Sequence, residues 1–183
     1  MNQTRASISF NNRVDSAQKS DPSGRLDPDC GLCSDSDEKS IVYRNEILRV
    51  IWVDDVRFPG FCRVISQIHV AEMLDLSEHQ QNQIWQAVLC VAHWQRTLLN
   101  PDKINLASLG NQVPHLHWHI IPRWQHDSHF PDSIWAQPVR VSAVEVAPEQ
   151  LKLFRETLAQ DLGQALKKSA FSTLIDGVDD QNL

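Results

Sequence analysis

Apolar side chains change their spacing along the chain, and each spacing predicts a different element of secondary structure. Residues 47–53 and 62–66 are two runs rich in β-branched, aliphatic and aromatic side chains, separated by the Phe-Pro-Gly breaker at 58–60. Runs of this length bounded by turn residues are typical of strands. We therefore expect two strands joined by a loop, with extended structure already beginning at Ile41.

Two later segments have the 3.6-residue spacing of amphipathic helices. The first follows Ser77, which can form a reciprocal cap with Gln80, and it stops before Pro101. The second opens at Pro148, a residue favoured at the first helical position. The spacing predicts that the first helix buries Ile84, Trp85, Val88, Leu89, Ala92 and Leu99, and the second Leu151, Phe154, Leu158, Leu162 and Leu166.

Two short strands complete the expected elements, at residues 104–109 and 115–121, with Pro122 ending the second. The strands follow one another along the chain and do not alternate regularly with helices. This order favours an α+β fold over a doubly wound parallel sheet. We expect an antiparallel sheet of about five strands with one long helix and a C-terminal helix.

The ends of the chain differ from its middle. The first forty residues contain only ten apolar side chains, too few to offset the entropy cost of ordering them. We expect a flexible N-terminal tail over residues 1–26, a folded domain that carries the chemistry over residues 27–145, and a C-terminal helix and tail over residues 146–183.

Composition narrows the classes of partner. The 183 residues carry a formal net charge of −6. An acidic balance argues against binding to DNA or RNA, whose phosphates are held by clustered Lys and Arg. The longest apolar stretch, residues 87–92, is far shorter than the roughly 20 residues of a membrane-spanning helix. The first ten residues lack a signal-peptide pattern. We expect a cytoplasmic protein with neither a membrane nor a nucleic acid polymer as partner.

Histidine is abundant and clustered: five of the eight histidines lie between His115 and His129. His115, His117 and His119 alternate with apolar residues, so a strand here would project all three imidazoles from one face. At strand spacing the outer two start about 13 Å apart, enough to line a slot for a phosphate chain. Imidazole can act as a nucleophile, a proton carrier and a donor to anionic oxygen. A solvated strand face and a metal cluster remain alternatives.

The sequence around these histidines resembles a known signature. Residues 110–123, GNQVPHLHWHIIPR, contain His-φ-His-φ-His-φ-φ, where φ is apolar, preceded by Gly and followed by Pro-Arg. This pattern is similar to that of the histidine-triad (HIT) superfamily. Upstream, residues 54–69 resemble the family's Asp, Pro-Gly and histidine segment. The resemblance implies a HIT-like fold and spans about residues 29–124.

The resemblance also implies an enzyme that cleaves a nucleoside 5′-phosphoryl bond through a nucleotidyl-histidine intermediate. By position in the motif, His117 is the expected nucleophile. His119 would hydrogen-bond the phosphate and help to protonate the leaving group. The expected substrates are dinucleoside polyphosphates or nucleoside phosphoramidates, and the family is commonly homodimeric.

Other residues are expected to contact the substrate. Either Asp54 or Asp55 would hold a ribose hydroxyl, with Asp54 as the first candidate. Phosphoryl oxygens can be met by amides and backbone N–H groups, without a lysine cluster. The candidates for this role are Asn105, Asn111, Gln112 and the guanidinium of Arg123.

Cys30 and Cys33 form a CxxC pair, a spacing that suits two thiolates on one Zn²⁺ but also a redox pair or two free thiols. Zinc-bearing HIT proteins resemble this layout, with His69 and His115 as the other two ligands. A structural Zn²⁺ would then link the N-terminal element to the sheet. Cys62 and Cys90 are expected to be apolar filler.

The chain departs from the family pattern at several positions, which leaves substrate choice open. Asn111 and Gln112 stand where Gln and a small hydroxyl residue are usual. Phe61 replaces a histidine, and residues 66–68 replace basic and proline residues. Residues 124–136 either form a loop that covers a leaving group or stacks a base, or a surface loop anchored by Trp135.

Two further function classes stay open at this point. One is a non-catalytic module that senses nucleotides or binds a partner protein. The other is a metalloenzyme in which the three alternating histidines hold a catalytic zinc. Ligands at every second residue of one strand are too spread to meet one ion easily, which disfavours the metalloenzyme.

Overall fold

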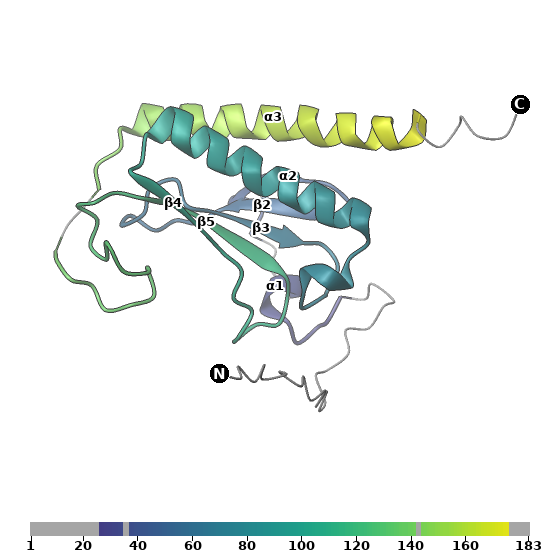
Figure 1. The fold of residues 1–183 in the computed structure, drawn as a ribbon, viewed down its shortest axis with the longest axis horizontal. Helices are drawn as coiled ribbons and strands as arrows, with labels where there is room; N and C mark the ends of the chain where they lie inside the picture. The colour runs from purple at the N-terminus through teal and green to yellow at the C-terminus, as the bar shows by residue number, and fades with distance from the viewer. Residues whose placement is uncertain (1–25, 35–36, 142–143, 176–183) are drawn as a thin grey trace, which may run out of the picture.

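The computed structural model describes residues 26–34, 37–141 and 144–175, so nearly all of the expected N-terminal tail lies outside the described residues. One antiparallel five-stranded sheet has the order β1-β2-β3-β5-β4 (Figure 1). This confirms the expected α+β class. The strands are β1 (Ile41–Arg44), β2 (Leu48–Trp52), β3 (Cys62–Ser66), β4 (Lys103–Ala107) and β5 (His117–Arg123).

Two long helices cover the same face of the sheet (Figure 1). They are α2 (Glu78–Trp94), continued by the π-helical turn η2 (Gln95–Leu99), and α3 (Pro148–Ile175). The Ser77 hydroxyl accepts from the backbone N–H of Gln80, and the Gln80 side chain accepts from Ser77 N–H, so the predicted capping box is present. Two short elements, α1 (Gly31–Ser34) and η1 (Met73–Asp75), flank β1 and α2.

The main core lies between this sheet face and the two helices. Because side chains alternate along a strand, every second residue of β2, β3 and β5 points into it. Each large apolar side chain buried there contributes roughly 1.5–3 kcal/mol. From α3 the core receives Phe154, Leu158, Leu162 and Leu166, as predicted, with Leu151 packed at its margin. Phe154 also contacts the Trp52 ring, at 5.8 Å between centroids.

The predicted buried stripe of α2 is too wide. Ile84 and Val88 are buried, but Trp85 is 42% exposed and Leu89 is 49% exposed. A helix on a sheet covers only a limited arc, and these two residues fall just outside it. Trp85 instead packs on its flank against Trp118, with 5.4 Å between ring centroids.

The limits predicted for the histidine strand are wrong at both ends. β5 begins at His117, because the chain before it turns, with His115 N–H donating to Val113 O. Pro122 lies inside β5, opposite Ile104 of β4. The pairing of β5 with β3 stops at Ile120, so a residue without an N–H is tolerated beyond it.

The loop between β2 and β3 is held close to η2 by Gly60. Its φ is +86°, and an added Cβ would lie 2.3 Å from Leu99 Cδ1, so only glycine fits there. The buried Gln95 side chain donates to the carbonyl oxygens of Gly60 and Ile120. These contacts tie the loop and β5 to the helical layer, leaving the opposite sheet face for chemistry. Within the described residues, every helix is too short or too polar to cross a membrane.

Candidate functional site

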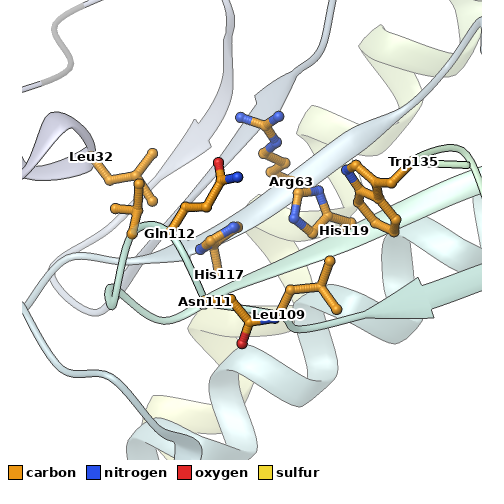
Figure 2. A pocket seen from close by; sticks show the side chains of 10 residues that line it. Leu32, Arg63, Leu109, Asn111, Gln112, His117, His119 and Trp135 are labelled. Atoms are coloured by element: carbon orange, nitrogen blue, oxygen red, sulfur yellow. The ribbon is translucent and has the colours of Figure 1, made fainter.

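The sheet face without long helices contains a cleft of about 400 Å³ (Figure 2). β5 contributes His117 and His119 to it, and the neighbouring strand β3 contributes Arg63. The described residues that line it are Leu32, Arg63, Leu109, Gly110, Asn111, Gln112, Val113, His117, His119 and Trp135. Residues from four separate parts of the chain therefore meet at the two adjacent histidines.

His117 is oriented by the backbone just before it. Its Nδ1 lies 2.6 Å from the carbonyl oxygen of His115, which can only accept, so Nδ1 carries the proton. In the neutral form of the ring, Nε2 then holds a lone pair, and the ring is half-buried at the cleft. A neutral imidazole with a fixed tautomer is suited to nucleophilic attack.

His119 lies beside His117, with 4.8 Å between ring centroids, and Trp135 packs against its other side at 5.1 Å. Burial, the charge of Arg63 and the proximity of His117 lower the pKa of His119 to about 3. His119 is therefore neutral near pH 7. In that form it offers one N–H donor to an anionic oxygen but is a weak source of protons.

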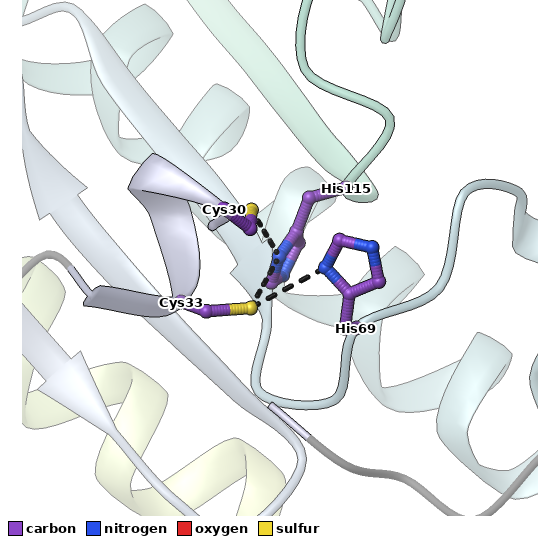
Figure 3. Close-up of side chains that lie close together, drawn as sticks. All are labelled: Cys30, Cys33, His69 and His115. Carbon is purple, nitrogen blue, oxygen red and sulfur yellow. Dashed lines mark hydrogen bonds between the residues drawn. The ribbon is translucent and has the colours of Figure 1, made fainter. Parts of the chain in front are cut away.

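His115 does not share the slot expected for three histidines. Its ring is fully buried and lies with Cys30, Cys33 and His69 (Figure 3). Nδ1 of His115 is 3.5 Å from Cys30 Sγ and 3.3 Å from Cys33 Sγ, and His69 Nδ1 is also 3.3 Å from Cys33 Sγ. All four candidate ligand atoms lie within 4.8 Å of one another.

This cluster fits a tetrahedral metal ion. Zn–S and Zn–N bonds of about 2.3 and 2.0 Å place ligand atoms roughly 3.3–3.8 Å apart. Nε2 of His115 donates to Ser66 O at 2.8 Å, which leaves Nδ1 as the ligand atom and supplies a typical outer contact. Burial raises the pKa of Cys33, so a metal would also serve to keep this thiol ionised. The four residues can form a metal site.

The metal cluster is separate from the cleft histidines. Among the described residues, the cluster takes only His115 from the triad. The geometry thus disagrees with a catalytic zinc held by all three alternating histidines. α1, which carries Cys33, is also fixed by Arg49, whose guanidinium donates to Leu32 O.

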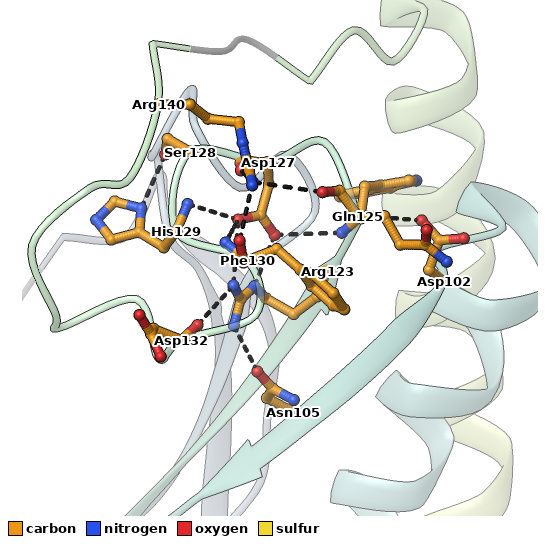
Figure 4. A network of polar contacts seen from close by, with 11 residues as sticks. Asp102, Asn105, Arg123, Gln125, Asp127, Ser128, His129, Phe130, Asp132 and Arg140 are labelled. Atoms are coloured by element: carbon orange, nitrogen blue, oxygen red, sulfur yellow. Dashed lines mark hydrogen bonds and ion pairs between the residues drawn. The ribbon is translucent and has the colours of Figure 1, made fainter.

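Arg123 is placed differently from the expectation of a phosphate contact. It is 1% exposed and donates from Nε to Asp127 at 2.7 Å and from Nη1 to Asn105 Oδ1 at 2.7 Å (Figure 4). A buried arginine needs such partners to offset its lost hydration. Neither Arg123 nor Asn105 lines the cleft, because the two side chains are hydrogen-bonded to each other.

Some of the other predicted substrate contacts line the cleft, and some do not. Asn111 and Gln112 line the cleft beside Gly110, which has a φ of +64° at the turn before the histidines. Asp54 is exposed and lies outside the cleft lining. Asp55 is held by Arg57, whose Nη2 is 2.7 Å away, and this hydrogen bond lowers the pKa of the carboxyl group.

Among the cleft residues that were not predicted as site residues, Arg63 and Trp135 have the charged and aromatic side chains. Arg63 interrupts the apolar run of β3 and stands opposite His119 in the strand register. Period-two alternation could have assigned it to the histidine face. In the segment after the triad, Trp135 lines the cleft and packs against His119, and the role of this segment toward a substrate stays a prediction.

The segment that carries Trp135 is built around Asp127. Burial by itself would raise the pKa of Asp127, but hydrogen bonds from Arg123 and from the N–H groups of His129 and Phe130 lower it overall. Arg140 donates to the carbonyl oxygens of Asp127 and Phe130. This buried network holds the loop in one shape beside the cleft.

Comparison with known proteins gives the family. The model of the HIT domain matches residues 35–126, half of the chain. The protein belongs to the HIT family. This HIT protein is 29% identical over 104 residues to an uncharacterised HIT-like protein of Saccharolobus solfataricus, covering 54% of this chain and 74% of that one.

Solved HIT structures share the fold. A histidine triad protein of Bradyrhizobium japonicum superposes with a TM-score of 0.55 at 24% identity, over 68% of this chain and 92% of the other. A histidine triad protein of Marinobacter aquaeolei superposes with a TM-score of 0.53 at 24% identity, over 70% of this chain and 92% of the other. The HIT assignment places the cleft in a nucleotide-binding family, while the match ends before Trp135.

Proposed function

We propose that this HIT protein is a hydrolase or nucleotidyl transferase that cleaves a nucleoside 5′-phosphoryl bond through a covalent intermediate on His117. The observation that carries the proposal is the hydrogen bond from His117 Nδ1 to His115 O, at 2.6 Å. It leaves the Nε2 lone pair for in-line attack on a phosphorus atom in the cleft. Dinucleoside polyphosphates and nucleoside phosphoramidates are the substrate classes.

The reaction has two displacements at the same phosphorus. In the first, His117 Nε2 forms a bond to the α-phosphorus, and the bond to the leaving group breaks with its electron pair. In the second, water or another acceptor attacks the phosphorus and gives its proton to solvent water, while the bond from phosphorus to Nε2 breaks with its electron pair returning to Nε2. Dividing one displacement into two lowers the barrier of each.

The other cleft residues bind and orient the phosphate. Neutral His119 donates an N–H to a non-bridging oxygen, and the amides of Asn111 and Gln112 are close enough to the cleft to add further donors. Trp135 covers one side of His119 and limits the access of water.

A structural Zn²⁺ is proposed on Cys30, Cys33, His69 and His115, supported by the donor set and its spacing. Bound there, it would link α1 to the end of β3 and stabilise the fold. Its bearing on the chemistry is positional, since His115 carries both a ligand ring and the carbonyl oxygen that orients His117.

A homodimer is also proposed, through the flank of α2 and the edge strand β4. Trp85, Leu89 and Leu106 are exposed there. Leu106 pairs with Ile120, so it lies on the helix side of the sheet, as the α2 residues do. Exposed apolar residues beside an unpaired strand edge are typical of an interface between subunits.

The test uses labelled dinucleoside polyphosphates and nucleoside phosphoramidates. The wild-type protein is expected to release nucleoside monophosphate and to yield an acid-labile nucleotide adduct on quenching. His117→Ala is expected to bind nucleoside monophosphate but to show neither turnover nor adduct. His126→Ala, which removes an exposed histidine outside the cleft lining, serves as the matched control. Undiminished turnover by His117→Ala would refute the mechanism.

A further inference from the structure

Among the described residues, one side chain of the Lys or Arg type lines the cleft. Of its ten lining residues only Arg63 is of this type (Figure 2). It stands on β3 directly opposite His119 of β5, so the two side chains project from neighbouring positions of the same sheet face. An acidic protein thus presents one guanidinium beside its two cleft histidines.

Arg63 is positioned by its strand and by an aromatic neighbour. Its guanidinium carbon lies 5.7 Å from the centroid of the Phe61 ring, a cation–π distance. β3 is an inner strand, bonded to β2 on one side and β5 on the other. Since Arg123 is buried against Asp127 and does not line the cleft, Arg63 is the arginine of the two that lies at the cleft.

Because His119 is neutral, the charge of Arg63 matters for which leaving group the cleft can stabilise. An amine that leaves from a phosphoramidate must gain a proton, and neutral His119 is a weak source of one. A phosphate that leaves from a phosphoanhydride departs as an anion and needs a nearby cation instead. Arg63 supplies such a cation next to His119.

We propose that Arg63 binds a second phosphate, adjacent to the phosphoryl group that His117 attacks, and so selects phosphoanhydride substrates over phosphoramidates. This inference rests on the proposed function. As the bond from His117 Nε2 to the α-phosphorus forms, the bond from that phosphorus to the bridging oxygen breaks. The electron pair stays on the bridging oxygen, which becomes a terminal oxygen of the leaving phosphate and is neutralised by Arg63. The step requires no proton transfer.

Equilibrium binding tests the site for the second phosphate without any turnover. The probes are adenosine 5′-monophosphate and its non-hydrolysable α,β-methylene diphosphate analogue, measured by calorimetry. The wild-type protein is expected to bind the analogue about tenfold to a hundredfold more tightly, the usual effect of a hydrogen bond between charged groups. Arg63→Leu should abolish the preference and Arg63→Lys should keep part of it. Arg96→Leu, an exposed arginine outside the cleft lining, should leave it unchanged.

A third probe locates the second phosphate. Adenosine 2′,5′-bisphosphate places it on the ribose rather than in the phosphate chain. If an Arg63-dependent gain appears for this probe and not for the methylene analogue, the proposed position is wrong. Equal affinities of the wild-type protein for monophosphate and analogue, or a preference that persists in Arg63→Leu, would also overturn the proposal.

Steady-state kinetics distinguishes a failure of this inference from a failure of the proposed function. Arg63→Leu is expected to lower kcat/KM for a dinucleoside polyphosphate by about tenfold to a hundredfold, and for a phosphoramidate of the same nucleoside by less than about threefold. Equal losses on both substrates would contradict a role in selectivity. Absence of a His117 adduct in the wild-type protein would refute the proposed function, while the binding comparison would still decide the role of Arg63.

Discussion

The carbonyl oxygen of His115 accepts a hydrogen bond from His117 Nδ1 at 2.6 Å, while the ring of the same His115 lies against Cys30 and Cys33. One residue therefore belongs to the candidate metal site through its side chain and to the candidate nucleophile through its backbone. A displacement of His115 would change the direction of the His117 lone pair. Fold stability and reactivity are linked at this point.

We predict that removal of the metal lowers both the stability of the fold and the rate of the reaction. The purified wild-type protein is expected to contain about one zinc per chain, and Cys33→Ala should lose it, melt at a lower temperature and turn over more slowly. The measurements are elemental analysis, thermal unfolding and steady-state rates. Cys90→Ala is the control, since Cys90 lies outside the cluster and should keep the metal. Equal metal content in both variants would exclude the site.

The pKa of His119 predicts a dependence of stability on pH. It is about 3 in the folded protein against an ordinary 6.5. Between these values the unfolded chain binds a proton that the folded chain does not, so stability falls as the pH falls below 6.5. From about pH 7.5 to about pH 5 this one group should cost about 2 kcal/mol.

The change that tests this dependence is His119→Gln, which cannot titrate. Its free energy of unfolding in urea should fall by about 2 kcal/mol less than that of the wild-type protein over the same pH interval. Contributions from the metal cluster cancel because both proteins keep it. If the two proteins lose stability in parallel, His119 is not held neutral by its surroundings.

Arg123 and Asp127 form the buried ion pair that fixes the segment after the triad. Asp127→Ala would leave the Arg123 charge buried without its partner, which typically costs 3–5 kcal/mol, so we expect a loss of about this size in urea unfolding. Asp132→Ala is the matched control, because Asp132 meets Arg123 only through its carbonyl oxygen. Similar losses of unfolding free energy in the two variants would show that the ion pair between Arg123 and Asp127 does not stabilise the fold in particular.

The proposed dimer interface predicts a change of mass in solution. The wild-type protein should have twice the chain mass by light scattering, and Leu106→Glu should have the chain mass, since a carboxylate would be buried at the interface. Leu74→Glu changes a residue that is 88% exposed in η1 and should leave the mass unchanged. A wild-type protein that is already monomeric would contradict the interface.

Local patterns predicted the fold well because they depend on near neighbours. The Ser77 cap, the buried side of α3 and the alternation through His117 and His119 all follow from the geometry of one element. The arc of α2 that faces the core does not, since it depends on where α3, β3 and β5 lie. Trp85 and Leu89 were therefore misassigned.

Charged residues were predicted less well, for a related reason. Arg123 follows the triad and has the chemistry of a phosphate ligand, yet Asp127, four residues later, pairs with it inside the protein. Arg63 has no motif around it, yet the β3–β5 register places it beside His119. The partner of a long charged side chain is decided by three-dimensional proximity, which spacing along the chain does not contain.

The sequence by itself determined the α+β class, the resemblance to the HIT family, and a cluster of candidate ligands and nucleophiles from Cys30 to His119. Those conclusions depend on residue type and short-range periodicity. The resemblance already grouped His115 with the cysteines, and the tertiary structure gives the physical reason, because a turn before β5 directs this ring away from the cleft that His117 and His119 line. Only the tertiary structure decided which arginine lines the cleft. Strand register and burial, which arise when distant segments pack, separate Arg63 from Arg123.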